Sequence, residues 1–342
     1  MAINPRATLK DVAAMAGVSR TTASNALDGS GRVSGATRDR VQRAAKQLGY
    51  SANVTAARLR TKALTNIGLY IPRSLAEVSF HMHFTLGAAS GARACGVDLT
   101  VLAYDGAASL NRVPAVDGFM IVEAMKDDPV VERLLDFGMP TLLVGHHLGA
   151  NARGSVIAID HAAMMTKALD YLESLGVRRP GLLGPEADFG SDWSESVLAS
   201  YRSWCAHRGI TPAHRPAPAL PNAVAIDQGV QELVMDEHID ALIGAHEGSA
   251  ALAVAALLRL GITVGPDFPV VSGVGSASDE HNLPPLTAVE MHPFEFGRAA
   301  AQRLIELIQQ PPAADQFWTH DASLVVRQST EFRGSTSHQR VS

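Results

Sequence analysis

Side chains that can read DNA bases lie at the start of a short predicted helix near the N-terminus, residues 20–27. Arginine can bind O6 and N7 of guanine through two hydrogen bonds, and asparagine can bind N6 and N7 of adenine in the same way. Arg20 and Asn25 supply one of each, and Thr21 points outward with them. Short hydroxyl residues, which suit phosphate contacts, flank these side chains: Ser19, Thr22 and Ser24. This set of residues predicts contact with nucleic acid.

Two helices joined by a tight turn are needed to hold these side chains in place. A helix-turn-helix requires a small residue where the helices cross, a turn residue four positions later, and an inward-facing apolar residue six positions after that. Ala13, Gly17 and Ala23 meet this spacing. The second helix of the motif enters the major groove with its N-terminal residues against base edges. The alternative is an amphipathic helix pair whose polar residues are simply solvated.

Capping residues set the expected bounds of these helices. Thr8, with Asp11 three positions later, predicts a capping box at the start of the first helix, and Gly17 predicts its end. Ser19 is expected to cap the second helix, and Ser34 a third that carries apolar residues at helical spacing. The polar, Ala-rich stretch 51–61 can form one more short helix.

Charge is divided unevenly along the chain. The 342 residues carry a formal net charge of −5. Residues 1–66 hold eleven Lys/Arg and three Asp/Glu, a net +8, whereas the rest of the chain holds 18 and 31, a net −13. A small basic region on a large acidic body indicates nucleic-acid contact at one end of the protein. On charge alone, the alternative is a solvated basic helix surface.

From residue 66 onward, short β-like runs alternate with amphipathic stretches. Ten such runs lie between residues 67 and 326, and strand–helix alternation over this length predicts a doubly wound α/β body with parallel sheets. Ten strands are many for one open sheet, so we expect two sheets side by side. The polar loop 184–194 follows one of these strands, at the kind of edge where α/β folds bind ligands.

Composition and cysteine usage exclude several classes of protein. Hydrophobic residues make up 46% of the chain and charged residues 18%, which is typical of a globular protein. The two cysteines, Cys95 and Cys205, predict reduced thiols in a reducing compartment. No signal peptide is predicted at the N-terminus, and the longest apolar run, 250–258, is about half of what a membrane span needs. We therefore expect a cytoplasmic protein without membrane contact.

Several short segments near the N-terminus form a specific pattern: Thr8–Ala13, Ala16–Ser19, Thr22, Val33–Ser34, Thr37–Arg38 and Leu48–Tyr50. They resemble the headpiece of the lac-repressor (LacI/GalR) family of bacterial transcription regulators. The α/β remainder resembles the effector domain of that family, a periplasmic-binding-protein-like pair of subdomains, as far as the closing segment Leu324–Thr330. The resemblance thus covers nearly the whole chain.

The resemblance implies a hinge helix that forms on operator binding and places a leucine in the minor groove. Leu59 matches that leucine, and Ala56 matches the small residue that lets paired hinge helices approach. An apolar wedge of this kind can unstack a base step and kink DNA. Asn53 belongs to the same segment, and Arg58 is expected to contact phosphate. Packing of Leu59 against the body is the alternative.

The resemblance also implies a small-molecule site in the cleft between the subdomains. The residues expected to line it are Phe80, His81, Asp160, Trp193, His246 and Glu247. Two usual anchors differ, since Val197 stands where the family has a ligand-binding arginine and Gly275 where it has an aspartate. A bidentate arginine and a carboxylate are the groups that best recognise sugar hydroxyls or an anion. We therefore expect a more aromatic, less charged pocket, or no effector. Each lining residue could instead belong to the core or the surface.

Other clusters do not predict catalysis or metal binding. His81 and His83, and the adjacent His146 and His147, lack the spacing of a zinc site. The turn 244–249 has flanking glycines but no lysine, so it is not a phosphate-binding loop. No persuasive nucleophile–base set is found. The sequence predicts neither a cofactor nor enzyme activity.

The combined prediction is a repressor of transcription that binds a pseudo-palindromic operator in double-stranded DNA as a homodimer. Its fold class is an α-helical helix-turn-helix headpiece plus an α/β body of two doubly wound parallel-sheet subdomains. The expected domains are a headpiece at 1–50, a hinge helix and linker at 51–65, an effector-binding and dimerisation domain at 66–332, and a tail at 333–342. A dimer is favoured over a tetramer because no leucine heptad follows residue 330. The alternatives are a solute-binding protein, and an α/β enzyme with an accessory DNA-binding head.

Overall fold

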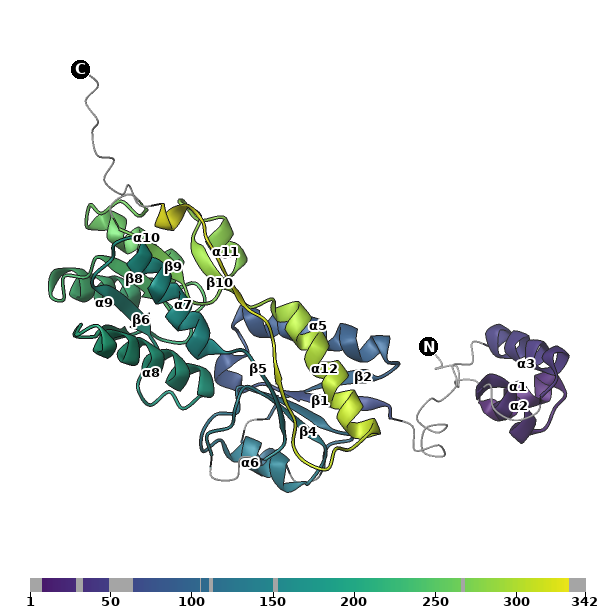
Figure 1. Cartoon of the computed structure of the whole chain (residues 1–342). Coiled ribbons are helices and arrows are strands. Elements are labelled where there is room, and N and C mark those ends of the chain that lie inside the picture. Colours follow the sequence, from purple (N-terminus) through teal and green to yellow (C-terminus); the bar gives the residue numbers. More distant parts are fainter. Residues whose placement is uncertain are drawn as a thin grey trace, which may run out of the picture. The chain divides into compact units, whose positions relative to one another are not determined.

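The computed structural model describes residues 8–28, 33–48, 64–104, 106–110, 113–149, 153–265 and 268–331. The chain forms two compact units, Met1–Leu64 and Thr65–Ser342, both drawn in Figure 1. Among the described residues, no helix is long and apolar enough to cross a membrane. The expected short helix at 51–61 and the tail at 333–342 lie outside the described residues.

Three helices form the described part of the first unit: α1 (Leu9–Ala16), α2 (Arg20–Asp28) and α3 (Gly35–Gln47). The predicted capping box of α1 is present, because the Thr8 hydroxyl accepts the Asp11 N–H at 3.4 Å and the Asp11 carboxylate accepts the Thr8 N–H at 2.8 Å. The helix ends at Gly17, whose φ of 62° is a left-handed conformation that favours glycine. The predicted start and turn of this motif are therefore confirmed.

The core of the three-helix unit is small and built largely of alanine. Its buried residues are Val12, Ala13, Ala16, Ala23, Ala26, Val41, Ala44 and Ala45. Each helix packs against the other two, and short side chains allow this close approach. Ala13 and Ala23 are both buried, as the helix-turn-helix spacing predicts. Arg20 and Thr21 of α2 are exposed, whereas Ser24, which the sequence placed among the hydroxyls suited to phosphate contact, is buried.

Two six-stranded sheets form the framework of the second unit (Figure 1). The first has the order β11-β5-β4-β3-β1-β2, and the second has the order β12-β10-β9-β8-β6-β7. Neighbouring strands are parallel, except that β12 is antiparallel to β10. The first sheet contains β1 (Asn66–Tyr70), β2 (Asp98–Leu102), β3 (Phe119–Val122), β4 (Thr141–Val144), β5 (Ser155–Ala158) and β11 (Phe317–Thr319). The second contains β6 (Pro180–Gly184), β7 (Ala213–Pro216), β8 (Ala241–Gly244), β9 (Val270–Ser272), β10 (Thr287–Glu290) and β12 (Ser323–Val325). The predicted pair of doubly wound sheets is confirmed.

Each sheet and its helices make one subdomain, and the chain passes between the two subdomains three times. The first subdomain carries α5 (Ser79–Ala94), α6 (Pro129–Asp136) and α12 (Pro293–Gln309). The second carries α7 (His161–Ser174), α8 (Asp192–His207), α9 (Ala223–Met235), α10 (Ser249–Arg259) and the short α11 (Ala277–Glu280). The passages run from β5 to α7, from β10 to α12, and from β11 to β12.

The structure differs from the sequence prediction at two strands and at the starts of two helices. Strands β7 and β11 were not expected, because both are short edge strands with little β-like patterning. The apolar spacing predicts helices over 85–94 and 197–208, but α5 begins earlier, at Ser79, and α8 begins earlier, at Asp192. His81 and His83 therefore lie on the first turns of a helix.

Glycines allow α5 and α12 to pack with their backbones close together. A Cβ atom at Gly297 would lie 2.0 Å from the Phe84 carbonyl oxygen, and one at Gly87 would lie 1.9 Å from the Phe294 carbonyl oxygen. No side chain could be accommodated at that distance. Phe84 and Phe296 fill the space beside this contact, with ring centroids 5.4 Å apart at 90°.

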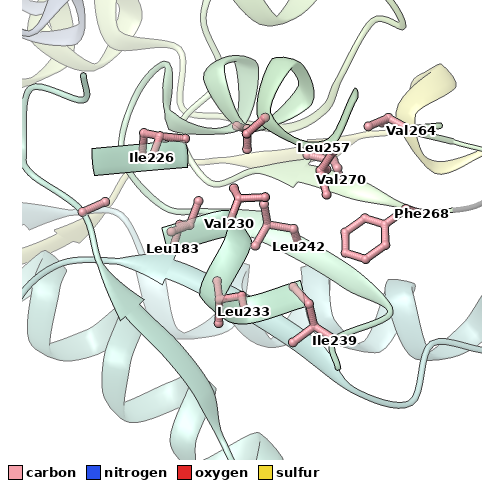
Figure 2. Close-up of a cluster of buried hydrophobic side chains, with 14 of the residues drawn as sticks. Leu183, Ile226, Val230, Leu233, Ile239, Leu242, Leu257, Val264, Phe268 and Val270 are labelled. Atoms are coloured by element: carbon pink, nitrogen blue, oxygen red, sulfur yellow. The ribbon is translucent and has the colours of Figure 1, made fainter. Parts of the chain in front are cut away.

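The second sheet buries one face against α9 and α10. Figure 2 shows this apolar cluster, in which Val230 and Leu233 of α9 approach Leu242 of the sheet. Together with Ile226 and Leu257 these side chains are fully buried. Burial of each is worth roughly 1.5–3 kcal/mol. This buried core supports the sheet from which the loops of the second subdomain extend.

Candidate functional site

The first turns of α2 present the polar side chains that the sequence singled out. Arg20 and Thr21 are exposed, and Asn25 is half-buried on the next turn. Ala23 and Ala26 of the same helix are buried in the core. The apolar side of α2 therefore faces the core, while its N-terminal polar residues remain free to contact a partner. A helix N-terminus also carries partial positive charge, which favours a phosphate-rich partner.

Hydroxyl residues cap α2 and α3 in the same way. The Ser19 hydroxyl accepts the Thr22 N–H at 3.0 Å and lies 2.8 Å from the Thr22 hydroxyl. The Ser34 hydroxyl accepts the Thr37 N–H at 3.3 Å and lies 2.8 Å from the Thr37 hydroxyl. Both predicted caps are confirmed. These hydroxyls hold the helix starts in place.

Of the remaining residues predicted to bind DNA, Thr8 is described by the structure and the hinge residues are not. Thr8 is exposed, and its hydroxyl donates to the Asp11 carboxylate at 2.7 Å. The expected hinge residues lie outside the described residues: Asn53, Ala56, Arg58 and Leu59. Their roles stay predictions.

A cavity lies in the second unit between the carboxyl ends of the strands of its two sheets. Its volume is about 80 Å³. The first subdomain contributes Leu75, Val78, Phe80, His81, Val122, Glu123, Val144, Gly145 and Phe296 to the lining; the second contributes His161, Phe189, Trp193, Ala219, His246, Glu247 and Val274. Ile159 and Met291, on passages between the subdomains, complete it. Five of the six predicted effector residues therefore line one cavity.

Aromatic rings gather around His246 in this cavity. The Trp193 and His246 ring centroids lie 4.9 Å apart at 63°, and Phe189 lies 6.0 Å from each of these rings. Phe80 meets His81 edge-on at 5.5 Å on the opposite subdomain. The predicted aromatic character of the pocket thus has a geometric basis.

The cavity histidines are held in the neutral form by burial. Burial lowers the pKa of His246 to about 4 and that of His81 to about 4. His81 Nδ1 lies 2.9 Å from the Leu75 carbonyl oxygen. Burial also lowers the pKa of His161 to about 4, against the opposing effect of the Asp160 carboxylate. At neutral pH these rings present one donor and one acceptor each.

Glu123 is a lining residue that sequence reasoning missed. It follows β3 directly and has a φ of 48°, a conformation that is uncommon outside glycine and often marks functional positions. Burial raises its pKa to about 7, the nearby Asp192 charge adds to this, and a hydrogen bond from Ser191 opposes it. Its position after a strand end was the signal that could have found it, as for Phe189 in the predicted ligand loop.

Glu247 joins the two subdomains across the cavity. It follows β8 in the second subdomain, whereas its partners Ser79 and Phe80 begin α5 in the first. The Glu247 carboxylate accepts the Phe80 N–H at 2.9 Å and the Ser79 hydroxyl. No side chain close in sequence caps α5. Glu247 therefore satisfies a backbone donor at the start of this helix from the other subdomain.

Asp160, the sixth predicted effector residue, is placed elsewhere. It is exposed, caps α7 by accepting the Ala163 N–H at 2.8 Å, and is absent from the cavity lining. Val197 packs in the core of the second subdomain, beside Tyr201 and Trp204. At Gly275, a Cβ atom would lie 2.7 Å from a Glu290 carboxylate oxygen. A glycine there therefore leaves room for Glu290.

The adjacent histidines His146 and His147, considered above for metal binding, each contact a different neighbour. His147 is buried, with Nε2 3.0 Å from the Glu132 carboxylate and Nδ1 3.3 Å from the Ala124 carbonyl oxygen. His146 stacks on Phe317 at 5.5 Å. Within the described ranges, no group of three His, Cys, Asp or Glu residues could hold a metal ion.

Comparisons with known proteins match both units. Residues 8–53 match the family described as bacterial regulatory proteins, lacI family, and residues 169–330 match the periplasmic binding protein-like domain. The HTH-type transcriptional regulator CelR of Thermobifida fusca is 27% identical over 338 residues, covering 95% of this chain and 98% of the relative. The regulator MalR of Streptomyces coelicolor is 27% identical over 336 residues, covering 94% and 96%.

Solved structures share the fold over nearly the whole chain. The lac repressor dimer bound to operator and the anti-inducer ONPF has a TM-score of 0.81 at 24% identity, covering 95% of this chain and 99% of that one. A complex of the regulator CelR with cellobiose has a TM-score of 0.67 at 25% identity, covering 95% and 100%. The chain therefore carries a helix-turn-helix domain of the lacI family of bacterial regulatory proteins and a periplasmic binding protein-like domain, and it is similar along its length to HTH-type transcriptional regulators.

Proposed function

We propose that this protein is a sequence-specific repressor of transcription that binds a pseudo-palindromic DNA operator as a homodimer. The observation that carries this proposal is the capped helix α2, whose exposed first turn presents Arg20 and Thr21 with Asn25 one turn later. Arg20 would bind a guanine and Asn25 an adenine in each half-site. Thr8, Ser19, Thr22 and Ser34 would contact the backbone from the helix starts.

The hinge residues complete the proposed DNA contact. Leu59 would wedge a central base step, Ala56 would let two hinge helices approach, and Asn53 and Arg58 would contact DNA beside them. Two-fold symmetry of the dimer is what makes the operator pseudo-palindromic. The lac repressor structure to which this chain is similar is a dimer on its operator.

An exposed apolar surface on the first subdomain supports dimerisation of the body. Met82 and Leu86 on α5 and Val101 on β2 are each 55% exposed and line the same hollow. Apolar side chains gathered in this way favour an interface over open solvent. We assign this surface to the homodimer.

A small-molecule effector would act through the cavity between the subdomains. A ligand shifts an equilibrium only if it binds one conformation of the body more tightly than the other. The Glu247 link between the subdomains is a contact that opening of the cleft would break. Phe80, His81, Trp193, His246 and Glu247 are the residues we assign to the effector site.

The experiment that tests the proposal is selection of random duplex DNA by the purified full-length protein at near-physiological salt. Enrichment of a pseudo-palindrome with a constant central step is the expected result. Equal recovery of all sequences, with and without cell extract as a source of corepressor, would contradict sequence-specific regulation. The basic headpiece would then bind DNA only non-specifically.

Two further assignments belong to the same proposal. We place the protein in the cytoplasm, where bacterial DNA is accessible. We also propose that it has no enzyme activity, consistent with its relatives, which are transcriptional regulators.

A further inference from the structure

The charge of the cavity lining disfavours an anionic ligand. Among the described residues that line the cavity, none is Lys or Arg. Its carboxyl groups belong to Glu123 and Glu247, and that of Glu247 is occupied by Ser79 and Phe80. An anion would therefore meet acidic groups with no cation to balance its charge.

The lining also offers few groups to a polyhydroxyl ligand such as a sugar. Most lining residues are apolar or aromatic, and His81 Nδ1 already lies at hydrogen-bond distance from the Leu75 carbonyl oxygen. Sugar hydroxyls that enter such a cavity would lose more hydrogen bonds to water than the few polar lining groups could replace.

His246 is a buried polar group of the cavity lining whose two ring nitrogens lack a hydrogen-bond partner among the described residues. The residue is 4% exposed. A buried, unpaired polar atom costs roughly as much as a lost hydrogen bond. Trp193 and Phe189 pack their rings around this imidazole. The unpaired nitrogens and the aromatic walls therefore lie at one place.

The size of the cavity limits the ligand further. Its volume of about 80 Å³ is the space of several water molecules, since roughly 10–15 Å³ is enough for one. A single ring fits this space better than a disaccharide does. Stacked or edge-on contact with Trp193 and Phe189 would stabilise such a ring.

We infer that the effector of this protein is a small, uncharged aromatic molecule whose one polar group hydrogen-bonds to His246. The inference rests on the proposed effector role of the cavity and names the class of its ligand. The ring lies against Trp193 and Phe189, and a hydroxyl or a similar group satisfies an imidazole nitrogen. Neither a sugar nor an anion fulfils these conditions.

A series of ring compounds with different charges tests the ligand class. The full-length protein is titrated by calorimetry with phenol, toluene, benzoate, benzylamine and D-glucose. Saturable binding of phenol, with benzoate and D-glucose at least tenfold weaker, is the expected result. Preferred binding of benzoate, of D-glucose, or of benzylamine would overturn the inference, and so would failure of every ring compound to bind.

Variants of His246 test the assigned hydrogen bond. His246→Phe keeps an aromatic ring but removes both nitrogens, so the Kd of phenol should rise about fivefold while that of toluene changes less than twofold. His246→Gln retains a donor and an acceptor and should restore part of the phenol affinity. His214→Gln is the matched control, because His214 also has a buried, unpartnered Nε2 but does not line the cavity. Equal losses for phenol and toluene in His246→Phe would contradict the hydrogen bond.

The two proposals fail in distinguishable ways. The same titrations are repeated on the protein bound to its selected operator, with DNA release measured by fluorescence anisotropy. Binding of phenol without any change in operator affinity would leave the ligand class standing and refute the effector role. Operator binding that responds to D-glucose but not to phenol would support the effector role of the cavity and refute the proposed ligand class.

Discussion

Arg20 is free to contact DNA because other residues of α2 do the packing. Its neighbour Ser19 holds the helix start, and Ala23 fills the core one turn later. The guanidinium therefore remains exposed on a fixed helix. Base readout depends on this combination of a free side chain and a rigid support.

Arg20→Ala should weaken operator binding by about 1–3 kcal/mol and relax specificity at one base pair per half-site. Arg43→Ala is the matched control, since it removes the same positive charge from an exposed position on α3. The two variants are compared by selection and by titration of the wild-type operator. Uniform weakening across all sequences by Arg20→Ala would make Arg20 a phosphate contact instead.

Glu123 should make stability depend on pH. Because its pKa is raised to about 7 from a model-peptide value of 4.5, the folded state favours its protonated form. Its stabilising contribution is present below pH 4.5 and is lost as the pH rises through 7. The Tm of wild type should therefore fall relative to that of Glu123→Gln between pH 5 and 8. A constant difference across this range would contradict the raised pKa.

At the scale of elements, the α5–α12 pair depends on the absence of side chains. Gly297→Ala would place a Cβ atom against the Phe84 carbonyl oxygen, so the helices must separate. We expect a loss of about 1–3 kcal/mol in the free energy of unfolding, measured by urea denaturation. Gly229→Ala in α9 is the control, because there the new methyl would meet the movable end of Leu183. Equal costs would argue against the backbone contact.

At the scale of the whole body, Glu247 couples the two subdomains. Glu247→Ala removes the acceptor of the Phe80 N–H and should shift the body toward an open cleft by about 1–2 kcal/mol. Faster hydrogen exchange at the first turn of α5 and a larger radius of gyration by X-ray scattering are the expected readouts. Glu186→Gln, in an exposed loop of the same subdomain, is the control. Unchanged exchange at Phe80 would show that the link does not hold the cleft.

The assigned dimer surface is tested at the same scale. Leu86→Glu places a charge on that surface and should produce a monomer by light scattering, with a loss of operator affinity because two half-sites can no longer be bound together. Leu258→Glu is the matched control, since Leu258 is 70% exposed on α10 of the other subdomain. If Leu86→Glu remained a stable dimer, the dimer interface would lie on another surface of the body.

Much of the fold could be predicted from local patterns. Capping at Thr8, Ser19 and Ser34, the turn at Gly17, and the alternation of strands and helices depend on residues close in sequence. The edge strands β7 and β11 could not be predicted in this way. Their short sequences show little β-like patterning, and each becomes a strand through hydrogen bonds to its neighbour, β6 for β7 and β5 for β11.

The cavity could likewise be predicted only in part, because some of its residues are brought together by contacts between segments far apart in the sequence. The sequence, through its resemblance to a known family, predicted five of the lining residues and hence an aromatic, weakly charged pocket. Only the tertiary structure decided that Glu123 lines the same cavity as His246. It also decided that Asp160 caps α7 outside the cavity and that Glu247 accepts a hydrogen bond from the start of α5. The physical reason is that burial and hydrogen bonding across 167 residues of separation depend on packing of the two subdomains, which no local pattern specifies.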